Sequence, residues 1–118
     1  MKIVKQADAE VIKYGNLESR EYKTNDPDIN LAVVKVSGRH PVQSYTVNTK
    51  CKELLYVLSG SGSITVNDEH YELGVSDEII VDQNEPYYLE GNFTVATICT
   101  PPWSLRQVKN VDKEGNEL

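Results

Sequence analysis

The sequence predicts a single all-β domain, an antiparallel sandwich or jelly roll, from three observations. Short segments rich in β-branched and aromatic residues recur along the chain, and several alternate apolar with polar residues as half-buried strands do. Gly, Pro, Asn and Asp fall between these segments, where turns are needed. No segment of ten or more residues carries the apolar stripe of an amphipathic helix, and 118 residues suit one domain.

The expected strands differ in how much of each is buried. Residues 53–58 are apolar on both faces, which is typical of a strand near the middle of a sandwich or barrel. The glycines in 59–62 predict a turn after it, and 67–69 predict a tight hairpin turn. The complete set of expected strands is 11–14, 31–36, 42–47, 53–58, 63–66, 71–73, 78–81, 87–89 and 93–99.

The two ends of the chain differ from its centre. The barrel core is expected over about residues 31–103 of a domain that covers 1–118. Residues 1–30 are expected to be a surface lead-in, because 16–28 is polar and turn-rich and its Asn-Asp-Pro-Asp run should break any regular element. The charged tail, 107–118, is expected to be loose.

Charge and composition exclude several classes of partner. The net charge is −6 and the pI is about 4.8, which favours solubility and argues against a nucleic-acid groove. No apolar run approaches the length of about 20 residues that a membrane span needs. The N-terminus lacks the apolar region of a signal peptide, so we expect a cytoplasmic protein in which Cys51 and Cys99 are buried thiols.

Two runs of sequence carry a family resemblance. In the first, six residues separate Glu53 from Gly60, and Gly38 lies upstream. The second covers 73–87, with a turn, a strand and a second turn that ends in Pro-Tyr. In this order, and joined by a hairpin, these runs resemble the two motifs of the cupin superfamily. The resemblance covers 38–102 and implies a cupin jelly roll, that is, a double-stranded β-helix barrel.

Some turn positions depart from the family pattern. Asn84 stands where a Gly is usual, and Asn is the next-best residue for a left-handed turn. Ser76 and Asp68 also replace glycines, and Asp82 replaces a proline. Each of these substitutions leaves the turn feasible.

The resemblance also identifies where a metal would lie. In the family, two His, a Glu and a final His hold it, and these positions carry Thr46, Asn48, Glu53 and Tyr87 here. Hydroxyls and a neutral amide bind iron, manganese, nickel and zinc poorly, so we expect no metal and no cofactor. A degenerate metal site that recruits His40 remains an alternative.

Glu53 is the residue around which a site is expected. If the family geometry holds, it points inward and shares its face with Cys51, which places a thiol near a carboxylate. A buried Glu must be hydrogen-bonded or protonated, and Tyr87 and Asn48 are the natural donors. The cluster is either a structural hydrogen-bond network or a pocket for a ligand.

Other polar and aromatic residues are expected to be structural. His40 is predicted to be an exposed turn residue, and His70 is predicted to be solvated beside a hairpin. Tyr56 and Tyr71 lie in strand patterns and are expected in the core. Trp103 follows two prolines and is expected to pack over the barrel end or at a dimer interface.

Three functions agree with these residues. The preferred one is a metal-free module that binds a small polar metabolite in the barrel mouth. The alternatives are a metal-independent isomerase or epimerase, with Glu53 as base and Tyr87 as acid, and the degenerate metal cupin. The resemblance also implies a homodimer. The predicted ligand-binding residues are Tyr45, Thr46, Asn48, Glu53 and Tyr87, with Arg39 as a further candidate.

Overall fold

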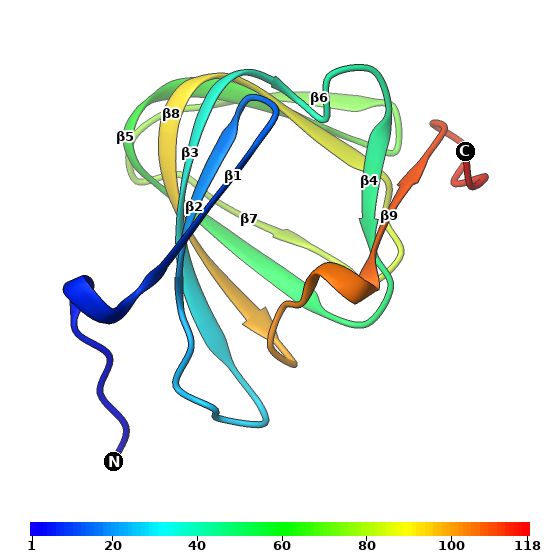
Figure 1. The fold of residues 1–118 in the computed structure, drawn as a ribbon. Coiled ribbons are helices and arrows are strands. Elements are labelled where there is room, and N and C mark those ends of the chain that lie inside the picture. Colours follow the sequence, from blue (N-terminus) through cyan, green and yellow to red (C-terminus); the bar gives the residue numbers. More distant parts are fainter.

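Nine antiparallel strands form one strongly curled sheet in the computed structural model, which describes all of residues 1–118 (Figure 1). The only helical elements are two three-residue 3-10 turns, Gln6–Asp8 and Leu105–Gln107. No helix is long and apolar enough to cross a membrane. The strands are β1 (Glu10–Tyr14), β2 (Leu17–Tyr22), β3 (Asn30–His40), β4 (Tyr45–Asn48), β5 (Lys52–Val66), β6 (Glu69–Leu73), β7 (Glu78–Val81), β8 (Tyr87–Thr100) and β9 (Val108–Val111).

Strand β8 is the centre of the sheet. It pairs along its length with β3 on one side and with β5 on the other, and its first residue also reaches β4. The path β1-β2-β3-β8-β4-β9 curls so that β4 and β9 face β1, β2 and β3 across the interior (Figure 1). This arrangement confirms the predicted all-β cupin-type jelly roll.

The turn predicted at 59–62 is instead part of a long strand. The segment continues as one strand, β5, which bends at a bulge between Val57 and Ser59. Gly60 follows with a φ of +79°, which glycine adopts at little cost. Residues 87–89 and 93–99 likewise form one strand, β8. Glycine in these segments therefore allows the strands to bend rather than ending them.

Three glycines lie side by side where the sheet curls most. Gly91 of β8 pairs with Gly38 of β3 on one side and with Gly62 of β5 on the other. A Cβ atom on Gly62 would lie 2.5 Å from the ring of Phe93. The ring and the neighbouring backbone thus occupy the space that any side chain at Gly62 would need.

Both ends of the chain add strands that the sequence did not predict. Residues 17–22 form β2 rather than a surface lead-in, and 108–111 form β9 rather than a loose tail. Val111 of β9 is buried, and β9 pairs with β4 over four residues. Strand β4 begins only at Tyr45, so the predicted strand at 42–47 starts too early.

Three turn positions where the resemblance places a glycine have a left-handed backbone. Asn84, Ser76 and Asp68 have φ values of +64°, +73° and +66°, and each replaces a family glycine. Asn67, beside Asp68, has a φ of +50°. Left-handed φ at the three substituted positions agrees with the expectation that each substitution leaves its turn feasible.

The core fills the interior at the bend of the long strands. Val36, Leu55, Val57, Ile64 and Val95 are each at most 2% exposed. Side chains on one face of a strand alternate with those on the other, so the neighbours of these residues face outward. For this reason the prediction that Tyr56 and Tyr71 lie in the core is wrong: they are 38% and 46% exposed.

Candidate functional site

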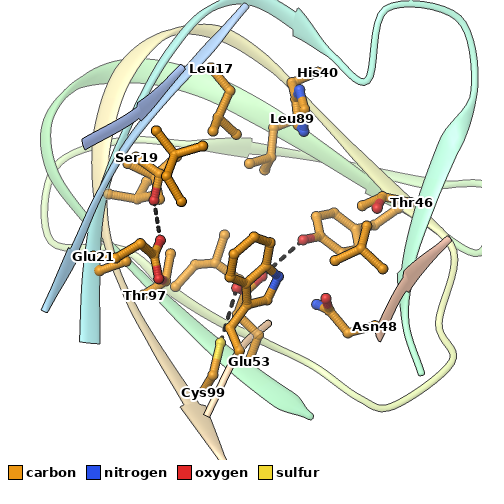
Figure 2. A pocket seen from close by; sticks show the side chains of 18 of the residues that line it. Leu17, Ser19, Glu21, His40, Thr46, Asn48, Glu53, Leu89, Thr97 and Cys99 are labelled. Atoms are coloured by element: carbon orange, nitrogen blue, oxygen red, sulfur yellow. Dashed lines mark hydrogen bonds between the residues drawn. The ribbon is translucent and has the colours of Figure 1, made fainter. Parts of the chain in front are cut away.

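A cavity of about 60 Å³ lies inside the barrel, at the end where the core stops (Figure 2). Strands β1, β2, β3, β4, β5, β8 and β9 all contribute side chains to its wall. Its apolar lining continues the core. The polar lining residues are Tyr14, Ser19, Glu21, Asn30, His40, Thr46, Asn48, Glu53, Tyr87, Thr97 and Cys99.

Glu53 lies at the base of this cavity with both carboxylate oxygens bonded. The hydroxyl of Tyr87 donates a hydrogen bond of 2.8 Å to Oε1, and the thiol of Cys99 donates one of 3.3 Å to Oε2 (Figure 2). Tyr87 is the donor that was expected. The second donor is the thiol of Cys99 rather than the amide of Asn48, and Cys99 comes from β8, directly opposite Glu53.

Burial controls the ionisation of this group. It raises the pKa of Glu53 above the ordinary value of 4.5, while the bonds from Tyr87 and Cys99 oppose the rise and the charge of Glu21 adds to it. Burial, with the neighbouring carboxylate, also raises the pKa of Tyr87 well above 10.0. A hydrogen bond with Cys51 is the main cause of the raised pKa of Cys99, followed by burial. Both cysteines are free, buried thiols, as predicted.

Glu21 is a second buried carboxyl in the same cavity. It lies on β2, is 3% exposed, and accepts a hydrogen bond from the hydroxyl of Ser19 on Oε2 (Figure 2). Its Oε1 is buried and has no hydrogen-bond partner. Burial raises the pKa of Glu21, and Ser19, Lys23 and the side chain of Asn30 partly offset the effect.

The sequence contained a signal for this second carboxyl. In the run 17–22, Leu17, Ser19 and Glu21 share one face of a strand. Their polarity concealed the alternation, because a half-buried strand usually places apolar residues on its inner face.

His40 lines the cavity, which corrects the prediction that it is an exposed turn residue. It is the last residue of β3 and is half-buried, and its ring meets the ring of Tyr14 edge-on at 5.1 Å between centroids. Burial lowers the pKa of His40 below 6.5, so its imidazole is neutral at pH 7. His70, by contrast, is exposed as expected, between Thr65 and Glu72.

The inner face of β4 carries two of the predicted ligand-binding residues. Thr46 and Asn48 are 6% and 4% exposed, they line the cavity, and no side-chain hydrogen bond joins either of them to the rest of the protein. Their polar atoms are therefore free to meet a ligand. Trp103 lines one end of the cavity, and its backbone N–H donates to the side-chain oxygen of Asn30 at 3.0 Å.

Tyr45, the fifth predicted residue, lies outside the cavity. Strand alternation turns it away from the face of Thr46, and its ring packs edge-on against Tyr88 at 5.2 Å. The guanidinium of Arg39 lies 3.9 Å from the centre of the Tyr88 ring and donates to backbone carbonyls of the same loop. Both residues support the outside of the barrel, so the expectation that they face a ligand is corrected.

The residues at the family's metal positions do not fit a transition metal. Thr46, Asn48 and Tyr87 offer two hydroxyls and an amide, which are weak ligands for such ions. Both oxygens of Glu53 already accept hydrogen bonds. No group of three or more His, Cys, Asp or Glu side chains in the chain could hold a metal ion.

Comparisons with known proteins find relatives by structure alone. No family model matches the chain, and no curated protein does. Pac13 from Streptomyces, in a variant determined with uridine, is 20% identical over 97% of each chain with a TM-score of 0.83. Pac13 is described as a nucleoside dehydratase.

Two further solved structures extend the comparison. Ectoine synthase from P. lautus is 17% identical, over 94% of this chain and 90% of that one, with a TM-score of 0.74. KdgF from Halomonas sp. is 14% identical, over 80% and 88% of the two chains, with a TM-score of 0.67. All three relatives are cupin-fold proteins, and the chain described here has the cupin fold.

Proposed function

We propose that this barrel binds a small polar molecule in its cavity and transfers protons to and from it without a transition metal. One observation supports this most: a buried carboxyl and a half-buried imidazole line the same cavity with pKa values shifted in opposite directions. Glu53 is moved toward its protonated form and His40 toward its neutral form. Two groups displaced in this way are suited to act as acid and base near neutral pH.

The proposed step is a balanced proton transfer. His40 accepts a proton from a C–H or O–H bond of the molecule, and Glu53 donates its proton to an oxygen of the same molecule. When that oxygen leaves as water, the reaction is a dehydration; when it stays, the reaction is an isomerisation. Solvent then returns a proton to Glu53 and removes one from His40.

This assignment changes the roles that the sequence suggested. Tyr87 was the candidate acid and Glu53 the candidate base. The pKa of Tyr87 is raised well above 10.0, which makes its hydroxyl a poor acid at neutral pH. We assign Tyr87 the role of holding the carboxyl of Glu53 in place through the 2.8 Å hydrogen bond.

The structural relatives support a reaction of this class. Pac13, the nucleoside dehydratase, shares the fold over nearly the whole chain. Removal of water needs a group that takes a proton and a group that gives one, which is what His40 and Glu53 offer.

A non-catalytic ligand-binding module is the second candidate. Both oxygens of Glu53 are occupied by Tyr87 and Cys99, as in a network that only maintains the barrel. The unbonded side chains of Thr46 and Asn48 would then bind the ligand without Glu53.

Exchange of substrate hydrogen with solvent distinguishes the two candidates. The protein is incubated in D₂O with a panel of nucleosides, short sugars, polyols and amino alcohols, and proton NMR follows the loss of C–H signals. We expect exchange or product formation for at least one compound, and loss of it in Glu53→Gln and His40→Asn. Glu72→Gln, which alters an exposed carboxylate, is the matched control.

Two results would contradict the enzyme assignment. One is binding of a panel member without exchange or turnover, which would favour the binding module. The other is turnover that Glu53→Gln leaves unchanged while the variant keeps its fold by circular dichroism.

A further inference from the structure

The wall of the cavity holds two carboxyl groups and no fixed positive charge. Two carboxyls, Glu21 and Glu53, line it, and no Lys or Arg does. His40, the single ionisable nitrogen group in the wall, is kept neutral by burial. A phosphate or carboxylate group of a ligand would enter this space without a counter-charge, which is costly in a buried site.

The nearby basic side chains do not line the cavity and have partners of their own. Lys23, two residues beyond Glu21, is exposed and pairs with Glu10 at 2.9 Å, and its charge only partly offsets the raised pKa of Glu21. Arg39 lies on Tyr88, outside the cavity.

Glu21 has an acceptor that the protein does not use. Its side chain is held on β2 by the hydroxyl of Ser19, which occupies Oε2, while the buried Oε1 has no partner. Buried polar atoms are nearly always bonded, so this oxygen is a place for a donor from a bound molecule. The side chain of Asn30 lies close enough to lower the pKa of Glu21, but it leaves Oε1 without a partner within hydrogen-bond distance. Glu53 has no unpartnered oxygen, because both of its oxygens accept hydrogen bonds.

We propose that the cavity accepts a small molecule with a protonated primary amine, held at Glu21, and with hydroxyl groups that meet Asn48 and Thr46. An ammonium group offers three donors and a charge opposite to that of the carboxylate. It satisfies Oε1 and keeps Glu21 ionised, while Glu53 keeps its proton for the chemistry. This inference rests on the proposed function and specifies its substrate as a small amino alcohol or amino sugar rather than a phosphorylated or carboxylated compound.

The size of the cavity limits the part of the molecule that enters. One water molecule needs roughly 10–15 Å³ of such space, so 60 Å³ admits about four to six non-hydrogen atoms. A three-carbon amino alcohol is of this size. A larger substrate would insert only its amine-bearing end.

Three compounds with one carbon skeleton test the inference. The probes are 3-amino-1,2-propanediol, glycerol and glycerate, and ligand-observed NMR gives their affinities for the protein. We expect the amine to bind about tenfold more tightly than glycerol, as a charge-assisted hydrogen bond implies, and glycerate not to bind.

Variants on β2 show whether Glu21 is responsible. Glu21→Gln keeps the shape and removes the charge, and we expect it to lower amine affinity about tenfold while leaving glycerol affinity unchanged. Glu18→Gln, on the opposite face of the same strand, is the matched control and should change neither. Ser19→Ala removes the hydrogen bond to Oε2 but keeps the charge of Glu21, so it should keep the preference for the amine.

Three outcomes would overturn the inference. They are binding of glycerol or glycerate at least as tight as that of the amine, no binding of the amine, and unchanged amine affinity in folded Glu21→Gln. The proposed proton-transfer function survives each of them if neutral compounds exchange hydrogen in a Glu53-dependent way.

Discussion

Replacing Tyr87 by Phe removes one hydroxyl group from the interior of the barrel and leaves the ring in place. The hydroxyl donates the 2.8 Å bond to Glu53, and both residues are buried, at 7% exposure each. Without it, Oε1 of Glu53 has no donor within the protein. Leaving a buried acceptor unsatisfied costs about 1–3 kcal/mol, and we expect this loss in the free energy of unfolding.

A double-mutant cycle isolates this contribution. Urea unfolding, followed by circular dichroism, is measured for the parent, Tyr87→Phe, Glu53→Leu and the double variant. In the Glu53→Leu background the acceptor is gone, so we expect Tyr87→Phe to cost little, with a coupling of about 1 kcal/mol or more. Equal costs of Tyr87→Phe in the two backgrounds would refute the role given to this hydrogen bond.

Other parts of the molecule give three further predictions. Burial raises the pKa of Glu53 above 4.5, so the contribution of Glu53 to stability is full below pH 4.5 and is lost as pH rises through its folded pKa. Urea titrations should therefore show Glu53→Gln gaining stability over the parent with rising pH, at up to about 1.4 kcal/mol per pH unit, and a difference that does not change with pH would contradict this. Gly62→Ala should destabilise the protein by about 1–3 kcal/mol because its Cβ would meet the Phe93 ring, whereas Gly74→Ala, whose Cβ would have no atom closer than 3.8 Å, should cost much less. Equal shifts in melting temperature for the two variants would argue against the close approach. We also propose a homodimer through the exposed outer face of β5 and β7, where Leu58 and Ile80 are 46% and 50% exposed. Light scattering should give twice 13.3 kDa for the parent and the monomer mass for Ile80→Lys, and a monomeric parent would contradict the proposal.

The central strands of the fold could be predicted from the sequence. The apolar run at 53–58 and the hairpin turn at Asn67 follow local rules, and the structure has them. The turn predicted at 59–62 was wrong because glycine also serves where two backbones approach closely. That approach depends on Gly91 and Phe93, which are about 30 residues away in the chain.

Only part of the candidate site could be predicted from the sequence. The motif spacing located Glu53, Thr46, Asn48 and Tyr87, and all four line the cavity. Glu21 was missed because a strand with polar residues on its inner face resembles a surface segment. Strand β2 acquires an inner face only by pairing with β3, a long-range contact that local sequence does not encode.

The environment of His40 could not be predicted for a related reason. A His-Pro pair shortly after a glycine is typical of an exposed turn. The extension of β3 to His40, opposite Leu89, places the ring over the cavity beside Tyr14. Burial, rather than any neighbouring residue in sequence, then lowers the pKa of His40.

An NMR titration of Glu53 and His40 tests the central claim most directly. Carbon-13 shifts of the Glu53 carboxyl and nitrogen-15 shifts of the His40 ring report each pKa in the folded protein, with Glu53→Gln and His40→Asn to assign the signals. The proposed acid–base pair predicts that Glu53 titrates above 4.5 and His40 below 6.5. A carboxyl at Glu53 that is already ionised below pH 4.5, or an imidazole at His40 that stays protonated above pH 6.5, would contradict it.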